Sequence, residues 1–433
     1  MKRVLLLMVT LCVAYSVSAQ GGRIFRSEAL PYDTRHDAIA EAQNNIKRRL
    51  VFAPEAIQIE GSSILVGQSL EIPFAWTDGL LYLHLENVGS AYTLSVNNQE
   101  VANVEDPFTP ADFDVTSFVK AGKNAFTVQL RESAHPALQS NISLPRTRFS
   151  NSYLFGQYKR SIRDFRIALI PDSTHRFGVL QVAIIAQNGY NYEEPVTVAY
   201  DIYDPNGKLL DFNYRQITIP GRSQDTVRFA PFIYHTYEHQ WAVGGQAPLY
   251  QVMLYTKRDG SMWEYMPLRV GFDQTTFRNG KFYRFGKEQP LRPASFNAAV
   301  DRKATATGMK ALKAKGINTL KPDYPQPQWY YELCDELGLF VIDRANINAP
   351  AAREDRTIGG TPSNDPALVD EYISRVQAMY YRSHNHPSVI AYLLGGRSGN
   401  GYAMYKAYQW LKSVESERPV IYEDADGEWN TDL

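Results

Sequence analysis

This chain of 433 residues has few cysteines, almost no excess of one charge and few long apolar runs. Its two cysteines are Cys12 and Cys334, and removal of a leader that contains Cys12 leaves no pair for an internal disulfide. Lys plus Arg is 45 and Asp plus Glu is 46, without a block of like charge. This balance argues against a nucleic-acid groove or an anionic-membrane patch as the main function.

The N-terminus has the pattern of a signal peptide. Lys2 and Arg3 precede an apolar run at residues 4–15, which is too short to span a bilayer. Val17-Ser18-Ala19 then fits the small-x-small cleavage rule. We therefore predict a signal peptide at residues 1–19, cleavage after Ala19, no membrane span, and export to the periplasm or the cell exterior.

The remaining chain has the composition of a folded protein, with 44% hydrophobic and 12% aromatic residues. At roughly 150 residues per domain, its length predicts about three domains. We predict a lead-in segment at residues 20–60, a jelly-roll β-sandwich at 61–171, an immunoglobulin-like β-sandwich at 172–272 and a partial (β/α) TIM-type barrel at 273–433.

The two sandwiches are predicted from short alternating strands separated by polar turns. The strands expected in the first are 80–86, 91–96 and 125–130, with a tight turn at Asn97-Asn98. In the second, after a boundary at Pro171-Asp172, they are 179–187, 196–203, 227–229 and 250–256. A short helix is expected at residues 37–50.

After Asn279-Gly280 the pattern changes to alternating strands and helices. Expected strands are 281–285, 317–321, 339–343, 388–394 and 419–423, and expected helices are 304–315, 328–337, 367–381 and 402–411. Apolar strands alternating with helices indicate a parallel sheet. A complete barrel needs about 250 residues, so this part amounts to about five-eighths of one. Its open edges and uncovered apolar interior predict a homo-oligomer, a protein partner that covers the edges, or a rearranged sheet covered by the sandwiches.

Several motifs, taken in chain order, resemble glycoside hydrolase family 2, which includes β-galactosidases, β-glucuronidases and β-mannosidases. Residues 94–128 are similar to its sugar-binding jelly roll, and residues 241–272 to the end of its immunoglobulin-like domain. The stretch 309–343, MKALKAKGINTLKPDYPQPQWYYELCDELGLFVID, resembles its barrel most closely, and residues 277–281, 385–390 and 418–423 agree with it.

This resemblance implies a site with two carboxyl groups, one an acid/base and the other a nucleophile. The family's acid/base glutamate follows the fourth strand in a Leu-Gly-Asn-Glu-Ser pattern, where this chain reads Leu394-Gly395-Gly396-Arg397-Ser398. Arginine stays protonated at any accessible pH and cannot exchange a proton there. The nucleophile is expected near a seventh strand, beyond Leu433. We therefore predict no catalytic residue, with Gly396 and Arg397 marking a degenerate acid/base position.

Other pocket positions also differ from the family pattern. Asp323-Tyr324-Pro325 replaces His-Tyr-Pro after the second strand, and Asp343-Arg344-Ala345-Asn346 replaces Asp-Glu-Ala-Asn after the third. The predicted substrate-binding residues are Asp323, Tyr324, Asp343, Arg344, Asn346 and Trp429. Asp343 has an alternative interpretation as a buried structural carboxylate.

The other polar and aromatic clusters give weaker signals. The acids at 423–428 fit a solvated tail, and Asp335 and Glu336 fit the solvent face of a helix, with a substitute catalytic role as the alternative. His384 and His386 lack a third ligand nearby, and we predict no metal site and no cofactor. Further candidates are His235 and His239 in a loop, a glycosylation motif at 141–143, and sugar-stacking or helix-packing aromatics at Trp329, Tyr330 and Tyr331.

Two functions follow from these observations. The first is an exported, non-catalytic carbohydrate-binding or interaction module. The second is an active β-glycosidase that uses relocated carboxylates, or one whose barrel is completed by a partner. A truncated reading frame is a further explanation for the short barrel.

Overall fold

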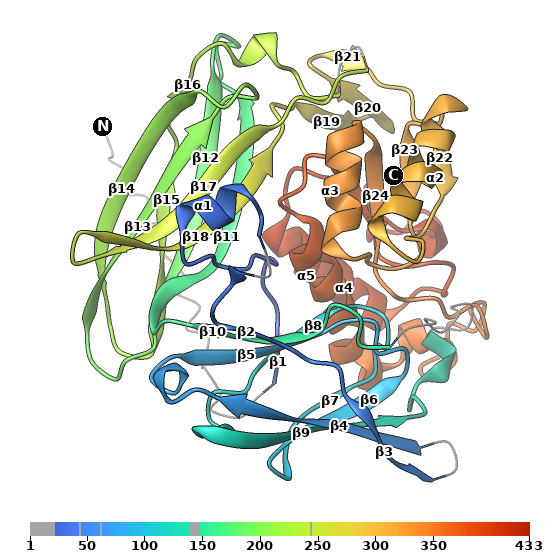
Figure 1. Cartoon of the computed structure of the whole chain (residues 1–433). Helices are drawn as coiled ribbons and strands as arrows, with labels where there is room; N and C mark the ends of the chain where they lie inside the picture. The colour runs from blue at the N-terminus through green and yellow to red at the C-terminus, as the bar shows by residue number, and fades with distance from the viewer. Residues whose placement is uncertain (1–21, 43–44, 61–62, 139–147, 243–244) are drawn as a thin grey trace, which may run out of the picture.

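The computed structural model describes residues 22–42, 45–60, 63–138, 148–242 and 245–433. Figure 1 shows two β-sandwiches and one α/β unit packed side by side. The predicted signal peptide and the motif at 141–143 lie outside the described residues. Among the described helices, none combines the length and the apolar character needed to cross a membrane.

The first sandwich consists of two antiparallel sheets of five strands each, and this confirms the predicted jelly-roll-like unit. One sheet has the order β1 (Arg23–Ile24), β8 (Ala111–Asp114), β5 (Leu80–Leu85), β10 (Tyr153–Gln157) and β2 (Arg49–Val51). The other has the order β3 (Glu55–Glu60), β4 (Ser63–Ile72), β9 (Gly122–Arg131), β6 (Ala91–Val96) and β7 (Gln99–Val104). Alternate residues of β9 are buried between the sheets, as period-two alternation predicts.

The segment before residue 60 is part of this sandwich, because β1 pairs with β8 and β2 pairs with β10. The helix expected at 37–50 is only α1 (Arg35–Ile39), where the Thr34 hydroxyl accepts a hydrogen bond from the Asp37 amide at 3.1 Å. The prediction was wrong at residues 45–50, which are not α-helical, and residues 49–51 pair with β10 instead.

The second sandwich packs two antiparallel sheets in an immunoglobulin-like manner. One sheet is β11 (Arg160–Pro171), β12 (Gly178–Asn188) and β15 (Ser223–Phe229), with β16 (Phe232–Ile233) also paired to β12. The other is β14 (Leu209–Ile219), β13 (Glu194–Tyr203), β17 (Tyr250–Arg258) and β18 (Ser261–Val270). Strand β11 precedes Pro171-Asp172 and pairs with β12 along its whole length.

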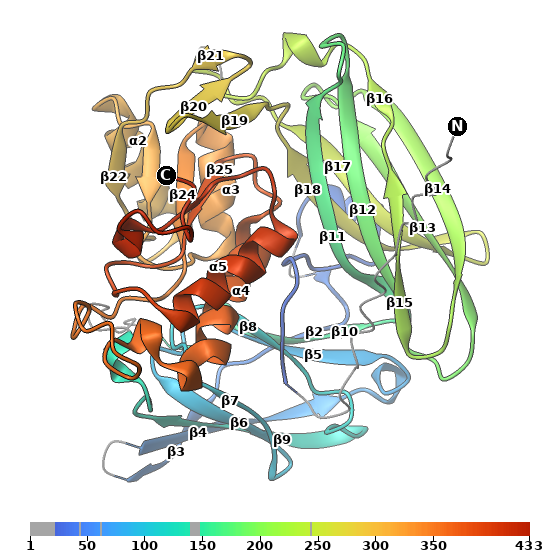
Figure 2. The ribbon, with the colours of Figure 1, turned by 180° about the vertical axis from the view of Figure 1, so that it is seen from behind.

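The α/β unit contains a parallel sheet of five strands, as predicted. Its order is β22 (Pro293–Ser295), β23 (Thr319–Lys321), β24 (Phe340–Arg344), β25 (Val389–Leu393) and β26 (Val420–Ile421). Helices α2 (Arg302–Ala314), α3 (Gln328–Leu337), α4 (Val369–Ser383) and α5 (Tyr402–Val414) cover one face, and Figure 2 shows α4 and α5 from behind.

The first strand of this sheet was predicted wrongly. Residues 281–285 form β20 (Lys281–Arg284), which pairs antiparallel with β19 (Thr275–Arg278) and β21 (Lys287–Glu288) in a small separate sheet. The first parallel strand is β22 instead, and its pairing with β23 brings Pro293 to a sheet edge, where a missing amide hydrogen is tolerated.

The second face of the parallel sheet is buried within the chain, so the expected uncovered interior is absent from the part of the chain that the structure describes. Phe340, Ile342 and Leu393 pack here against Trp241 and Phe282. Trp241 is fully buried, and its indole N–H donates to the Asp335 carbonyl at 2.8 Å. Of the arrangements expected for a partial barrel, the structure supports the covered sheet.

The outer edge of β26 is also occupied. The Val420 amide donates to an Asp432 carboxylate oxygen at 2.8 Å, and the Asp432 amide donates back to the Val420 carbonyl at 2.8 Å. The Tyr422 amide donates to the Thr431 hydroxyl at 3.1 Å. Residues 431–432 therefore satisfy edge groups that could otherwise pair with another strand.

Candidate functional site

Carboxyl ends of parallel strands meet at one edge of a sheet, and this edge carries functional residues in barrel folds. Here it carries Asp323 after β23, Arg344 at the end of β24, Gly396-Arg397 after β25 and Glu423 after β26. The structure thus brings the predicted Asp323, Arg344, Gly396 and Arg397 to the same edge.

Gly395 and Gly396 lie against the loop that follows β24. The Gly396 amide donates to the Ile347 carbonyl at 2.8 Å. A Cβ at Gly395 would lie 2.9 Å from that carbonyl oxygen, and one at Gly396 would lie 2.9 Å from Asn348 Oδ1. The close approach of the two loops requires a residue without a side chain at Gly395 and leaves little room for one at Gly396.

Arg397 extends into solvent at the expected acid/base position, with 67% of its side chain exposed. Its Nε lies 3.9 Å from Glu423, and the other oxygen of Glu423 lies 3.6 Å from Lys321 Nζ. Glu423 therefore lies between two cations at the carboxyl edge of the sheet.

Asp323 and Arg344 form a second ion pair at this edge. An Arg344 Nη atom contacts Asp323 Oδ1 at 2.5 Å, and Arg344 Nε donates to the Asp323 carbonyl at 3.0 Å. Asn297 Nδ2 donates to the other carboxylate oxygen at 2.9 Å. The Asp323 carboxylate thus has partners on both oxygens.

Asp343 faces the helices and is fully buried. The Tyr331 hydroxyl lies 3.0 Å from both of its carboxylate oxygens. Burial raises the pKa of Asp343 to about 7, although hydrogen bonds from Ser383, Tyr331 and the Arg344 amide oppose the rise. A perturbed carboxyl is typical of catalytic sites, but this one contacts helix side chains and not a cavity. The structural interpretation of Asp343 fits its surroundings.

Two further predicted residues join the α/β unit to the first sandwich. Asn346 Nδ2 donates to Asp106 Oδ1 at 2.6 Å, and both residues are buried. The Tyr324 ring packs on Phe108 with 5.3 Å between centroids. Asn346 acts at this domain contact, whereas Tyr324 also lines the cavity described below.

Trp429 lies over helix α5, where it contacts Tyr405 and Tyr408, and it remains 53% exposed. The neighbouring acids form ion pairs: Glu428 and Asp426 contact Arg356, and Asp424 lies 3.7 Å from Arg353. The acids at 423–428 are partly solvated, as expected, and the structure adds ion pairs to nearby arginines.

The expectation that Asp335 lies on a solvent face was wrong. Asp335 is buried, contacts His386 Nδ1 at 2.6 Å and accepts the Ser388 amide at 3.0 Å. Glu336 has the partly exposed position predicted and pairs with Arg302 at 2.7 Å.

Tyr330 and Tyr331 are fully buried in helix packing. His235 begins a single 3-10 turn and is exposed beside Glu238.

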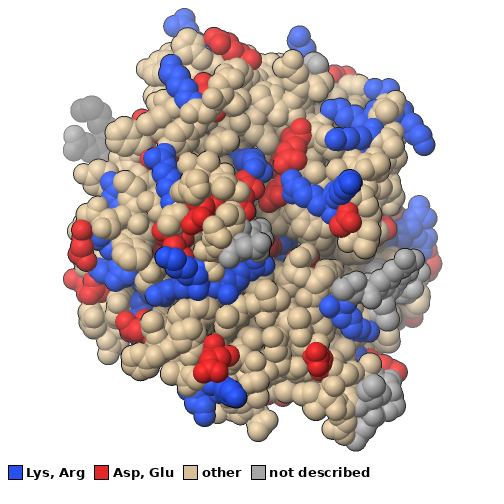
Figure 3. Space-filling model, viewed as in Figure 1, with Lys and Arg blue, Asp and Glu red and all other residues tan. Residues whose placement is uncertain are grey.

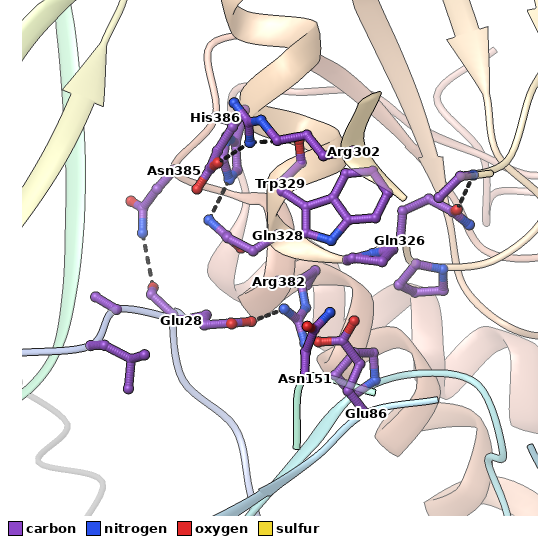
Figure 4. Close-up of a pocket in the computed structure, with 18 of the residues that line it drawn as sticks. Glu28, Glu86, Asn151, Arg302, Gln326, Gln328, Trp329, Arg382, Asn385 and His386 are labelled. Carbon is purple, nitrogen blue, oxygen red and sulfur yellow. Dashed lines mark hydrogen bonds and ion pairs between the residues drawn. The ribbon is translucent and has the colours of Figure 1, made fainter. Parts of the chain in front are cut away.

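A cavity of about 1030 Å³ lies where the two sandwiches, the lead-in segment and the α/β unit meet. Figure 3 shows acidic and basic side chains around the hollow at the centre of this face. Figure 4 shows Trp329 and Gln328, from the start of α3, beside Arg302 from the start of α2. Arg302 contacts Glu332 at 2.6 Å.

Gln328 provides an unsatisfied polar group in this cavity. Its Nε2 lies 2.7 Å from His386 Nε2, whereas its buried Oε1 has no hydrogen-bond partner among the residues that the structure describes. A buried acceptor without a partner is unusual in a folded protein. Neither Gln328 nor Arg302 was among the predicted site residues, because they converge only when α2 and α3 pack together.

Comparison with known proteins agrees with this architecture. The model for the family 2 glycosyl hydrolase TIM barrel domain matches residues 293–432, and the model for the sugar binding domain of the same family matches residues 32–139. A β-galactosidase of Priestia megaterium is 27% identical over 365 residues, which cover 80% of this chain and 35% of that protein. A β-galactosidase of Psychromonas ingrahamii is 27% identical over 398 residues, covering 88% of this chain and 37% of that protein.

Solved structures show the same fold. A Bacteroides uniformis β-glucuronidase superimposes on this chain with a TM-score of 0.70 at 16% identity. The superposition covers 93% of this chain and 52% of the β-glucuronidase chain. A family 2 glycosyl hydrolase from Bacteroides cellulosilyticus superimposes with a TM-score of 0.68 at 16% identity. This superposition covers 92% of this chain and 57% of the hydrolase chain. The chain spans little more than a third of the two β-galactosidases. Both matched domains and their order show that the chain belongs to glycoside hydrolase family 2.

Proposed function

We propose that this chain binds carbohydrate without hydrolysing it, and that it acts outside the cytoplasm after export. The observation that carries the proposal is Arg397, an exposed guanidinium at the position where the family resemblance places the acid/base carboxyl. Retaining and inverting mechanisms both need a carboxylic acid there to protonate the leaving oxygen. A guanidinium cannot give up its proton at accessible pH.

The carboxylates nearby do not supply a substitute acid. Asp323 is paired with Arg344, and Glu423 lies between Lys321 and Arg397. Asp343 has a raised pKa but contacts Tyr331 behind the sheet. Each of these carboxylates is thus engaged by protein side chains.

We place the carbohydrate in the cavity beside Trp329. A volume of about 1030 Å³ accommodates several sugar rings. The indole offers an apolar face for stacking, and it lies beside Gln328 in the cavity lining. Arg302 and Glu332 supply further polar groups on the same wall.

Calorimetric titration of the purified chain against a panel of β-galactoside and β-glucuronide oligosaccharides tests binding. Trp329→Ala is expected to weaken binding about tenfold or more, because it removes the stacking surface. Trp429→Ala is the matched control, since Trp429 is an exposed indole over α5 and outside the cavity lining. No detectable binding of any oligosaccharide in the panel, or an equal loss of affinity in both variants, would contradict the proposed binding site.

Hydrolysis of aryl β-galactosides and β-glucuronides is measured in parallel. We expect no turnover by the wild-type chain. Turnover that disappears in Asp323→Asn or Glu423→Gln would instead establish relocated carboxylates. Mass spectrometry of the protein recovered from the native host tests export, with a mature N-terminus at Gln20 as the expected result.

A further inference from the structure

A second group of polar side chains lies on the opposite wall of the junction. Glu28, from the segment after β1, meets His84 and Glu86 from β5 and the residue after it. One ligand atom from each of these three residues lies within 4.8 Å of the others. His84 and Glu86 are buried, and Glu28 and Glu86 line the cavity.

His84 is oriented with one ring nitrogen toward this group. Its Nδ1 contacts Asp112 Oδ1 at 2.6 Å, and Asp112 in turn accepts from Arg26 Nε at 2.8 Å. The imidazole also stacks on Tyr153, with 4.7 Å between centroids. In the neutral tautomer that donates Nδ1–H to Asp112, the lone pair of Nε2 faces Glu86.

The atom that faces the group is unsatisfied. His84 Nε2 is buried and has no hydrogen-bond partner in the described part of the chain, with Glu86 Oε2 3.5 Å away. This separation agrees with two ligands of one tetrahedral ion, because bonds of about 2.0–2.2 Å place ligand atoms about 3.3–3.5 Å apart.

The carboxylates are also positioned by neighbours. Arg382 of α4 contacts Glu28, and Asn87 Nδ2 lies 3.5 Å from Glu86 Oε1. Figure 4 shows Glu28, Glu86, Asn151 and Arg382 directed toward one another at the cavity wall. Outer partners of this kind orient metal ligands in known sites.

The charge balance leaves a need for one more cation. Glu28, Glu86 and Asp112 contribute three negative charges, and their contacts Arg26 and Arg382 contribute two positive charges. Among these ion-pair contacts alone, neutral His84 leaves one negative charge in excess, which is costly in a buried site, and Arg49 lies further away over the Tyr153 ring. Two kinds of cation fit this position: a proton on His84 Nε2 or a metal ion between His84 and the carboxylates.

We propose that Glu28, His84 and Glu86 bind one divalent transition-metal ion of the zinc type. One imidazole and two carboxylates form a ligand set of borderline hardness that suits Zn²⁺ and Co²⁺. Three protein ligands leave a fourth position, which here opens toward the cavity. The ion would tie the lead-in segment to β5 of the first sandwich, beside Arg382 of α4.

The proposal is tested with the untagged, EDTA-treated full chain and Zn²⁺ alone, by equilibrium dialysis with metal analysis at pH 8. One equivalent is expected to bind, and Co²⁺ is expected to give the visible absorption of a low-coordinate nitrogen–oxygen site. Glu86→Gln and His84→Gln are expected to weaken binding at least about a hundredfold. Glu105→Gln is the matched control, because Glu105 belongs to the same sandwich but pairs with Arg131.

Asp112→Asn gives a second test that leaves all three ligands in place. Loss of the outer carboxylate is expected to weaken the site about 10- to 100-fold. Binding that Glu86→Gln and Asp112→Asn leave unchanged would assign the ion to exposed histidines and overturn the proposal. Absence of binding to the wild-type chain would also overturn it, and would assign the missing cation to a proton on His84. Neither result depends on the sugar titrations, so the two proposals can fail separately.

Discussion

Glu264 offers a direct test of the energetics of the contact between the two sandwiches. It lies in β18 with a positive φ of 54°, at an irregularity in the pairing with β17, and its side chain is buried. Gln157 of β10 donates to one carboxylate oxygen at 3.3 Å, and the Thr256 hydroxyl lies 3.4 Å from the other. These neutral donors do not offset the loss of water, and burial raises the pKa of Glu264 to about 8.

The sign of the pH effect follows from proton binding. Above an ordinary pKa of 4.5 the unfolded chain has released this proton, whereas the folded chain retains it up to about pH 8. Folding then requires proton uptake, so stability falls as the pH rises, by about 1.4 kcal/mol per pH unit. Through Glu264 alone the wild-type chain should lose roughly 3 kcal/mol between pH 5 and pH 8.

Glu264→Gln keeps the shape of the side chain and removes its titration. We expect the variant to lose less stability than the wild type over this range, by roughly 3 kcal/mol. Urea unfolding at pH 5, 6.5 and 8 measures the difference, with tryptophan fluorescence as the signal because Trp263 is adjacent and packs on Tyr158. Asp343 also titrates in this range but is present in both proteins, so it cancels.

Glu415→Gln is the matched control, with the opposite sign. Burial disfavours the charge of Glu415, but Arg418, Arg166 and backbone amides outweigh it and hold its pKa below the usual value. The contribution of Glu415 to the free energy of unfolding is present at neutral pH and is lost on acidification. Parallel pH profiles for Glu264→Gln and the wild type would show that Glu264 titrates normally, and would refute the reasoning.

Three further variants test the packing that closes the α/β unit. Trp241→Ala removes the buried indole over the second face of the sheet and its bond to the Asp335 carbonyl; we expect a loss of about 3–5 kcal/mol in urea unfolding. Gly395→Ala places a methyl group 2.9 Å from the Ile347 carbonyl oxygen, and calorimetry should show a lower Tm corresponding to about 1–3 kcal/mol. Asp432→Ala frees the edge of β26 and also removes contacts to Lys412 and Tyr408; we expect a loss of about 1–3 kcal/mol and concentration-dependent association in sedimentation. A normal Tm in Gly395→Ala, or monomers at all concentrations in Asp432→Ala, would contradict the respective contact.

Local sequence patterns were sufficient for most elements of the α/β unit. Helix α3 has the predicted bounds, because Gly338 in a left-handed conformation ends it. Strands such as β24 were recognisable since both of their faces are apolar. The replacement at Arg397 was also visible in the sequence, and the structure adds that its side chain is exposed beside Glu423.

The outcomes that needed tertiary structure depend on contacts between distant segments. Residues 281–285 have a strand pattern, but only the position of their partners distinguishes a hairpin from a parallel strand. Asp335 has the helical position of a solvent-facing residue, yet His386 and the Ser388 amide lie against that face. Asp343 lies near the end of β24 and Asn346 follows it, as site residues of barrels do. Asp343 nevertheless contacts Tyr331, and Asn346 contacts Asp106.

The sequence by itself indicated the family and the order of its domains, and it has Arg397 where the family resemblance places a carboxyl, because each of these signals is carried by residues close together in the chain. Only the tertiary structure decided that the interior face of the five-stranded sheet is covered by Trp241 and its neighbours. The cavity wall with Gln328 and the cluster of Glu28, His84 and Glu86 likewise became visible only in the folded chain. The physical reason is that burial and convergence of polar groups depend on packing between segments that are far apart in the sequence.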